Sequence, residues 1–331
     1  MPGVKTDGIR ADLVTRRAPL AGVLLIAAGA SLWGLDGALR KPLTDTWSAY
    51  TIVLWEHVIL VAVTGPYLWL HRAELRRLTP VGWLSVLVIG WGGSAIATLL
   101  FTEAISMSLA NLNVIVLLQK TQPLWAIAAA AIVLSERPRP QIGALLIPAA
   151  IGTYLLSFGW MSPSEAAASP QLRPALYALA AAALWGSATA FGRRGLQEVQ
   201  FPVLTGLRFA TALPLLFVIA AWKDAVAPPA GTPAADWLRL PLLALGSGLL
   251  AMLLYYRGLR TTPATVATIA ELAFPATALI VNHVFLGYSL AGWNIVGFII
   301  LWVTIVLIYR VPVSVPRGRE VAVPPPLPSG A

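Results

Sequence analysis

The feature that most constrains this chain is its number of long apolar segments. A helix needs about 20 apolar residues to cross a hydrocarbon core of ~30 Å, and ten segments reach that length. Only 11% of the residues are charged, against about 25% in a soluble domain, so most of the surface must face something other than water. The sequence predicts an all-α polytopic membrane protein with ten transmembrane helices. They cover roughly 18–38, 48–70, 81–105, 110–134, 140–160, 173–192, 202–222, 237–258, 263–286 and 291–309.

The ten segments form two copies of one five-helix unit. Trp33-Gly34 in the first segment recurs 152 residues later as Trp185-Gly186, and Pro123 recurs at the same offset as Pro275. Between these markers, 98–106 matches 252–260 at an offset of 154. Because five is odd, the second copy must be inverted across the membrane. Inverted repeats place a binding site near the midplane, where the halves meet, so this pattern indicates a transporter.

Composition and basic residues predict five parts and an orientation. The expected parts are a cytoplasmic basic tail at 1–17, repeats at 18–160 and 173–310, a connecting loop without helical periodicity at 161–172, and a disordered Pro-rich tail at 311–331. The side that receives both termini carries about three times as many Lys and Arg as the other side. We therefore expect both termini in the cytoplasm and the chain in the inner (plasma) membrane.

Composition also excludes several function classes. The chain has no Cys, which excludes disulfides, thiol catalysis and Cys-based metal sites. It has no nucleotide-binding loop and no motif of a soluble hydrolase, and its basic residues lie in loops and tails, unlike a nucleic-acid-binding stripe. We expect no cofactor, no metal and no enzyme activity. The expected partners are a small-molecule substrate and the lipid bilayer, with protons a candidate coupling ion and monomer and homodimer both open.

Charged side chains inside the apolar segments are the main site candidates. Lys120 lies in LLQKTQP, where an ion costs at least ~2.5–3.5 kcal/mol to insert. Such residues usually line a polar cavity or pair with one another. The others that we expect to line a cavity are Glu103, Arg257 and Glu271.

The repeat relates an acid to a base at two places. Glu56 corresponds to Arg208, and Glu103 corresponds to Arg257. Equivalent positions approach one another near a pseudo-two-fold axis, so either pair can form. We predict a structural ion pair between Glu56 and Arg208, with cavity lining as the open alternative.

Polar and aromatic neighbours complete the candidate site. Asn113 lies seven residues before Lys120 and so shares its helix face, and Gln119 is the repeat partner of Glu271. Tryptophans deep in their segments are candidate pocket walls, with core packing as the alternative. The aromatic candidates are Trp33, Trp91, Trp185 and Tyr255.

These features together resemble the EamA-type transporters of the drug/metabolite transporter superfamily. The resemblance covers about 20–310 and rests on LWG in the first helix of each half, the Pro in the fourth helix and LSERPRPQIG at 134–143. It implies a ten-helix inverted-repeat fold that moves amino acids, amines, other metabolites or drugs. The implied cavity is lined mainly by helices 3, 4, 8 and 9, beside helices 1 and 6.

We therefore predict a secondary active exporter of a small polar or zwitterionic metabolite, such as an amino acid or amine, working by alternating access. Lys120 and Arg257 would meet a substrate carboxylate, and Glu103 or Glu271 its amine or a coupling proton. One alternative is uptake of a quaternary amine through a tryptophan cage. A non-transport membrane protein is the other, and Glu56-His57 is its one candidate acid–base pair.

Overall fold

Apolar helices make up the molecule. The computed structural model describes residues 20–107, 111–133, 140–259, 270–271, 273–290 and 292–310, and all regular structure within these ranges is helical. Nine described helices are apolar enough to lie in a membrane. Six are also long enough to cross it: Leu20–Thr44, Ala49–Leu70, Pro80–Ser106, Leu172–Gly192, Phe201–Trp222 and Ala234–Tyr255. Three are shorter: Gly143–Phe158, Ala273–Leu286 and Trp293–Ile308.

These helices fit a polytopic membrane protein, while the count of ten spans stays a prediction. The predicted tails, 1–17 and 311–331, lie outside the described residues, as does 263–269 at the start of the predicted ninth helix.

Interruptions divide several spans into shorter elements. The first half contains α1 (Leu20–Gly34), α2 (Asp36–Thr44), α3 (Ala49–Leu70), η1 (Arg72–Arg77), α4 (Pro80–Leu87), η2 (Val88–Ile96), α5 (Ala97–Ser106), α6 (Leu112–Leu118), η3 (Gln119–Thr121), α7 (Gln122–Val133) and α8 (Pro140–Phe158). The second half contains α9 (Pro163–Ala168), α10 (Leu172–Gly195), α11 (Phe201–Trp222), α12 (Ala234–Pro241), η4 (Leu242–Leu250), α13 (Ala251–Leu259), α15 (Ala273–Leu286) and α16 (Trp293–Arg310). Elements η1 and η3 are 3₁₀-helices, whereas η2 and η4 are π-helices.

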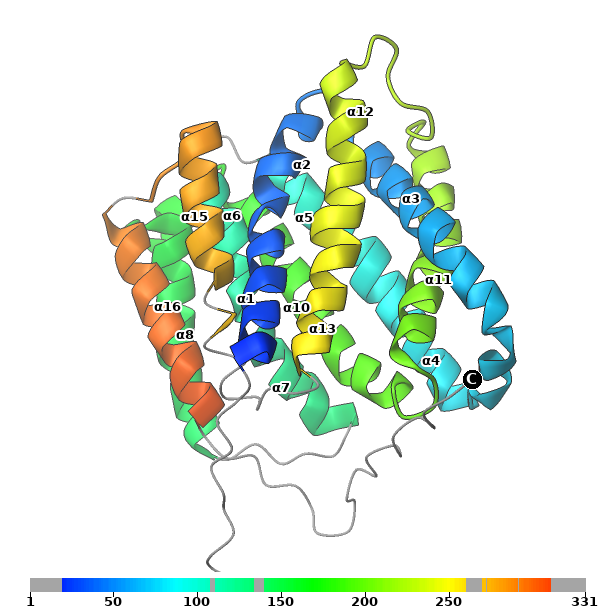
Figure 1. Cartoon of the computed structure of the whole chain (residues 1–331). Helices are drawn as coiled ribbons and strands as arrows, with labels where there is room; N and C mark the ends of the chain where they lie inside the picture. The colour runs from blue at the N-terminus through cyan, green and yellow to red at the C-terminus, as the bar shows by residue number, and fades with distance from the viewer. Residues whose placement is uncertain are drawn as a thin grey trace, which may run out of the picture.

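The two halves run in opposite directions. In Figure 1, α4 leads upward into α5, whereas the equivalent pair runs downward from α12 into α13. The π-helix η2 joins α4 to α5, and the π-helix η4 joins α12 to α13. The two π-helices occupy the same repeat position, 154 residues apart. Packing follows the same relation, because α1 contacts α13 and α15 while its counterpart α10 contacts α5 and α7. The first helix of each half is thus embedded in the other half.

Two glycines allow this close packing. A Cβ atom added at Gly34 would lie 2.8 Å from the carbonyl oxygen of Phe274, and one added at Gly186 would lie 2.4 Å from that of Gln122. Phe274 and Gln122 are themselves repeat-equivalent, and each directly precedes a proline. The Trp-Gly motif is therefore explained by contact between a first helix and the backbone at the bend of the opposite half.

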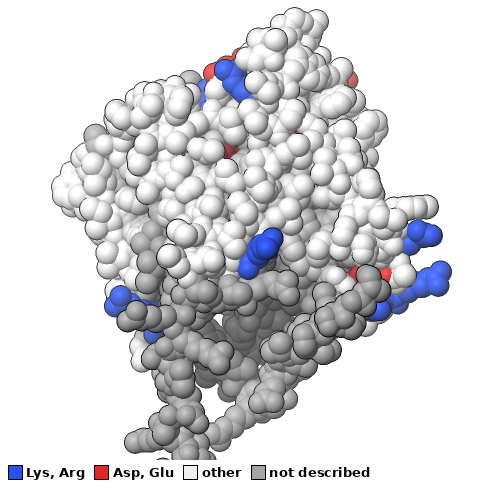
Figure 2. Space-filling view, in the orientation of Figure 1, with Lys and Arg blue, Asp and Glu red and all other residues white. Residues whose placement is uncertain are grey.

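The surface fits a lipid environment. Figure 2 shows a face almost free of charge, with charged atoms gathered mainly at its upper end and lower corners. Large apolar side chains are exposed around the bundle, such as Phe217 at 53%, Val284 at 66% and Phe285 at 73%. In the interior, every residue of the mainly apolar helix α6 is buried. Helices that are apolar on all faces are typical of membrane spans.

The connecting loop predicted at 161–172 contains a short helix, α9. Ser162 and Glu165 form a capping box at its start, in which each side chain bonds the other's backbone N–H. These bonds hold the pKa of Glu165 below its ordinary value. The connecting loop predicted here thus includes a short helix, and six residues are too few to show apolar periodicity in the sequence.

Candidate functional site

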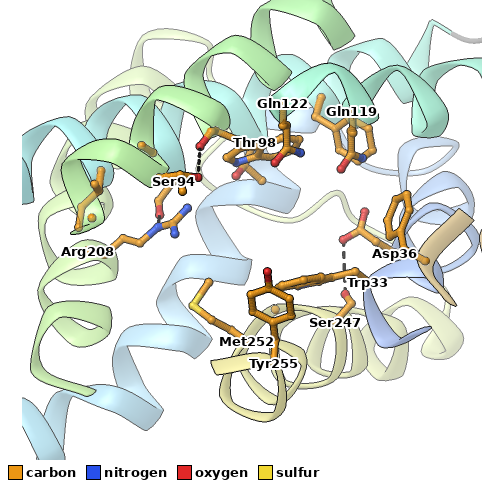
Figure 3. Close-up of a pocket in the computed structure, with 18 of the residues that line it drawn as sticks. Trp33, Asp36, Ser94, Thr98, Gln119, Gln122, Arg208, Ser247, Met252 and Tyr255 are labelled. Atoms are coloured by element: carbon orange, nitrogen blue, oxygen red, sulfur yellow. Dashed lines mark hydrogen bonds between the residues drawn. The ribbon is translucent and has the colours of Figure 1, made fainter. Parts of the chain in front are cut away.

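A cavity of about 560 Å³ lies between the two halves, a size typical of small-molecule sites. Helices of both repeats line it. In Figure 3, Gln119 and Gln122 face Trp33, Met252 and Tyr255 across the open space. The lining includes both buried and exposed residues, since Arg40 is 2% exposed and Leu196 is 36% exposed.

Aromatic pairs form two walls of this cavity. Trp33 packs on Tyr255 with ring centroids 4.9 Å apart, and Trp185 packs on Phe101 at 5.3 Å. The two pairs are repeat-equivalent, so one stands on each side of the pseudo-two-fold axis. Trp185 is held in place because its Nε1–H donates to the carbonyl of Gly93 at 2.7 Å.

Polar groups break the equivalence of the two walls. The Tyr255 hydroxyl donates a hydrogen bond to Glu271, whereas Phe101 and Gln119 occupy the equivalent positions. Lys120 has its Nζ 3.9 Å from the centroid of the Phe274 ring, a cation–π contact. Glu271 also attracts the Lys120 ammonium electrostatically. A carboxylate and an ammonium thus lie beside the Trp33–Tyr255 wall, whereas Phe101 and Gln119 at the equivalent places are uncharged.

A buried ion network closes one end of the lining. Arg40 donates to both Asp36 oxygens, at 2.8 and 2.9 Å, and to Glu56 Oε2 at 2.9 Å. It also donates to the Thr102 hydroxyl at 3.0 Å, and the Ser247 hydroxyl donates to Asp36 at 3.4 Å. The Arg40 and Glu56 side chains are only 3% and 6% exposed. The network ties α2, α3, α5 and η4 together.

Six of the ten predicted substrate-binding residues lie in the cavity lining. They come from both halves and include the charged pair, one amide and three aromatic rings. They are Lys120, Glu271, Gln119, Trp33, Trp185 and Tyr255.

Asn113 lies elsewhere. It is 1% exposed, and its Oδ1 accepts a hydrogen bond from Asn282 at 2.8 Å, between α6 and α15. The prediction that Asn113 shares a face with Lys120 assumed one continuous α-helix. The 3₁₀ turn η3 interrupts that helix at Gln119–Thr121, and Lys120 lies in the cavity lining whereas Asn113 does not.

Glu103 and Arg257 are also outside the lining, and they lie far apart. Glu103 is half-buried near the end of α5, where its carboxylate interacts with Tyr50 and Arg173. Arg257 is exposed in the last turn of α13. Inversion explains the difference from the predicted pairing, because equivalent positions near helix ends lie at opposite depths.

The predicted partner of Glu56 was Arg208, but Glu56 pairs with Arg40. Arg208 instead donates from its Nε to the Ser94 hydroxyl at 2.5 Å. Both residues line the cavity, which agrees with the alternative left open from the sequence. Glu56 lies two turns into α3 and Arg208 two turns into α11, so inversion again separates them in depth.

Trp91 does not complete a three-tryptophan cage. Its ring is 47% exposed, and its Nε1–H donates to the carbonyl of Thr211 at 3.1 Å. The π-helix η2 lies at this position and changes the direction of side chains along the span. Of the three predicted cage residues, Trp33 and Trp185 line the cavity.

Sequence reasoning missed the ion network. Arg40 was assigned to a loop because the first segment was ended at residue 38, whereas α2 continues to Thr44. The spacing of Asp36 and Arg40, four residues apart, was the available signal, since such pairs meet on one helix face. Gln122 was also missed, although it directly precedes Pro123, the proline that recurs in both repeats.

Comparison with known proteins agrees with this geometry. The model of the EamA-like transporter family matches the chain twice, over 20–158 and 172–310. This chain belongs to the EamA-like transporter family. As an EamA-like transporter it is a multi-pass membrane transporter and not an enzyme, and its partners are a small-molecule substrate and the lipid bilayer.

Two similar proteins cover nearly the whole transporter. The riboflavin transporter ImpX of Fusobacterium nucleatum subsp. nucleatum is 29% identical over 293 residues, which is 88% of this chain and 98% of that protein. A solved crystal structure shares 21% identity at a TM-score of 0.59, covering 88% of this chain and 97% of that one. At this identity the crystal structure supports the fold alone.

Proposed function

We propose that the chain is a secondary transporter with ten spans in two inverted repeats, and that it carries a planar aromatic metabolite with polar edges. Riboflavin is the first candidate. The observation that carries this proposal is the presence of two repeat-equivalent aromatic pairs, Trp33–Tyr255 and Trp185–Phe101, on one cavity of about 560 Å³. The name of the similar ImpX protein, a riboflavin transporter, supports the same class of solute.

Aromatic walls and neutral polar groups suit such a solute better than a simple amino acid. Offset or tilted ring pairs contribute about 0.5–1.5 kcal/mol beyond the area they bury, so four rings favour a planar solute. The amides of Gln119 and Gln122 face the cavity and can bond ring carbonyls and hydroxyl groups. A zwitterionic amino acid is the second candidate, because Lys120 and Glu271 attract one another and could hold a carboxylate and an ammonium.

Transport would proceed by alternating access around this cavity. The network of Arg40 with Asp36 and Glu56 closes one end, and breaking it would open that end. We assign the Arg40 end to the outside and both termini to the cytoplasm, because Lys and Arg are more frequent on the side of the termini. Proton coupling and export, both predicted from the sequence, remain parts of this proposal.

Proteoliposomes test the proposal directly. Purified full-length protein is reconstituted, and riboflavin flux is followed by its own fluorescence in both directions, with and without a pH gradient. We expect saturable flux that Trp33→Ala reduces strongly. The matched control is Trp69→Ala, since Trp69 is 69% exposed and outside the lining. Riboflavin flux equal to that of protein-free liposomes contradicts the assignment, and transport of an amino acid instead favours the second candidate.

A further inference from the structure

The repeat supplies an internal comparison between the two cavity walls. Each wall consists of a tryptophan from a first helix and an aromatic ring from the opposite half. Tyr255 differs from its equivalent, Phe101, by one hydroxyl group, and Glu271 differs from its equivalent, Gln119, by its charge. These two differences occur in side chains that bond each other, since the Tyr255 hydroxyl donates to Glu271. One wall therefore carries a carboxylate that a tyrosine hydroxyl orients, and the other has a neutral amide and a phenyl ring at the equivalent places.

This carboxylate lies at the edge of the wall formed by Trp33. Tyr255 packs against Trp33 with an interplanar angle of 50°, and its hydroxyl leads to Glu271. A flat solute lying on Trp33 would therefore meet Glu271 with its rim and not with its face. A carboxylate has about four acceptor positions, so the bond from Tyr255 leaves it able to accept an N–H.

Lys120 supplies the complementary donor. Its ammonium is positioned over the Phe274 ring and is attracted by Glu271. Lysine has three N–H donors and no acceptor, so it can donate to a carbonyl oxygen. An acceptor and a donor in the lining of one cavity match a solute edge on which an N–H stands next to a C=O.

We propose that Glu271, Tyr255 and Lys120 form the specificity subsite of this transporter, and that it recognises a lactam or imide edge of a fused aromatic ring system. Glu271 accepts the ring N–H, Lys120 donates to the adjacent carbonyl, and Tyr255 orients Glu271. The inference rests on the proposed function, because it takes a planar aromatic solute as given. It adds the polar edge that the solute must carry and the three side chains that bind this edge.

Comparing the binding of two flavins tests the subsite separately from the rest of the cavity. The purified full-length protein in detergent is titrated with riboflavin and with riboflavin methylated on the ring N–H, and bound flavin is followed by fluorescence. A hydrogen bond to a charged group contributes about 1.5–3 kcal/mol. We therefore expect the methylated flavin to bind wild type roughly 10- to 100-fold more weakly.

Variants then assign this discrimination to named side chains. Glu271→Leu removes the acceptor and should bring the two affinities within about threefold of each other. Tyr255→Phe copies the other half and should reduce the ratio to an intermediate value. The matched control is Phe101→Tyr, which adds the same hydroxyl to the other wall and should shift both affinities together. If Glu271→Leu fails to fold, as judged by its thermal transition, Tyr255→Phe decides.

The outcomes separate the two proposals. Equal binding of the two flavins by wild type overturns the subsite while flavin binding itself stands. Absence of binding by both flavins overturns the proposed function. Competition by an amino acid that is lost in Glu271→Leu assigns these residues to a zwitterion and also overturns the lactam edge.

Discussion

Replacing Arg40 by methionine tests the buried ion network most directly. Arg40 makes charge-assisted bonds to Asp36 and Glu56 while only 3% exposed. Its removal leaves two carboxylates without their cation. Breaking a buried pair on one side costs about 3–5 kcal/mol, whereas the apolar stem of methionine keeps most of the packing. We expect Arg40→Met to unfold well below wild type.

The structure also predicts how the loss of stability divides between the two carboxylates. The Asp36 side chain is 20% exposed and keeps its bond from Ser247, so water and this hydroxyl compensate part of its charge. Glu56 is 6% exposed and should carry the larger share. Adding Glu56→Gln to Arg40→Met neutralises that carboxylate and should recover about half of the loss, or roughly 2 kcal/mol.

Thermal unfolding in detergent measures this cycle. A loss of 3–5 kcal/mol corresponds to a midpoint lowered by roughly 6–10 °C. The neighbouring pair Lys41–Asp45 is the control, because Asp45 is 60% exposed and exposed pairs contribute only ~0–1 kcal/mol. If Arg40→Met melts like Lys41→Met, or if Glu56→Gln lowers stability further in the Arg40→Met background, the reasoning about buried charge is refuted.

Three further predictions follow from packing, from the cavity and from a buried amide pair. Gly186→Ala brings a Cβ within 2.4 Å of a backbone carbonyl and should lower the free energy of unfolding by about 1–3 kcal/mol. Gly143→Ala is the control, because a Cβ there has nothing within 4 Å, and thermal unfolding compares the two variants. Thr189→Cys places a single thiol in the cavity of a chain without cysteine, and riboflavin should slow its labelling by a maleimide. Asn282→Leu removes the partner of buried Asn113 and should cost about 1–3 kcal/mol in thermal unfolding, most of which Asn113→Leu should restore.

The apolar spans and the repeat could be predicted because both depend on the local sequence. The length of each apolar segment follows from the bilayer, and Trp-Gly and Pro recur because each marks a backbone contact. Lys120 and Glu271 could be selected because the cost of burying a charge requires a reason for its presence. These inferences need no knowledge of which way a side chain points.

Direction and depth were the parts that sequence could not supply. Spacing relates Asn113 to Lys120 along one helix, but it does not show that Lys120 lines the cavity while Asn113 packs between α6 and α15. Pairing Glu103 with Arg257 ignored that inversion moves equivalent positions to opposite ends. Arg40 was missed because the end of a helix inside a long apolar segment is set by tertiary bonds, here to Glu56 and Thr102.

Under the proposed alternating access, the ion network affects how often each conformation is occupied. An inverted duplicate with identical copies would be equally stable open to either side. Here the repeat counterparts of Asp36, Arg40 and Glu56 are Ala188, Gly192 and Arg208, so the opposite end cannot close with the same bonds. Every 1.4 kcal/mol of imbalance changes the ratio of the two conformations about tenfold. The resting orientation is thus encoded in three side chains, and a solute reverses it only by binding the other conformation more tightly.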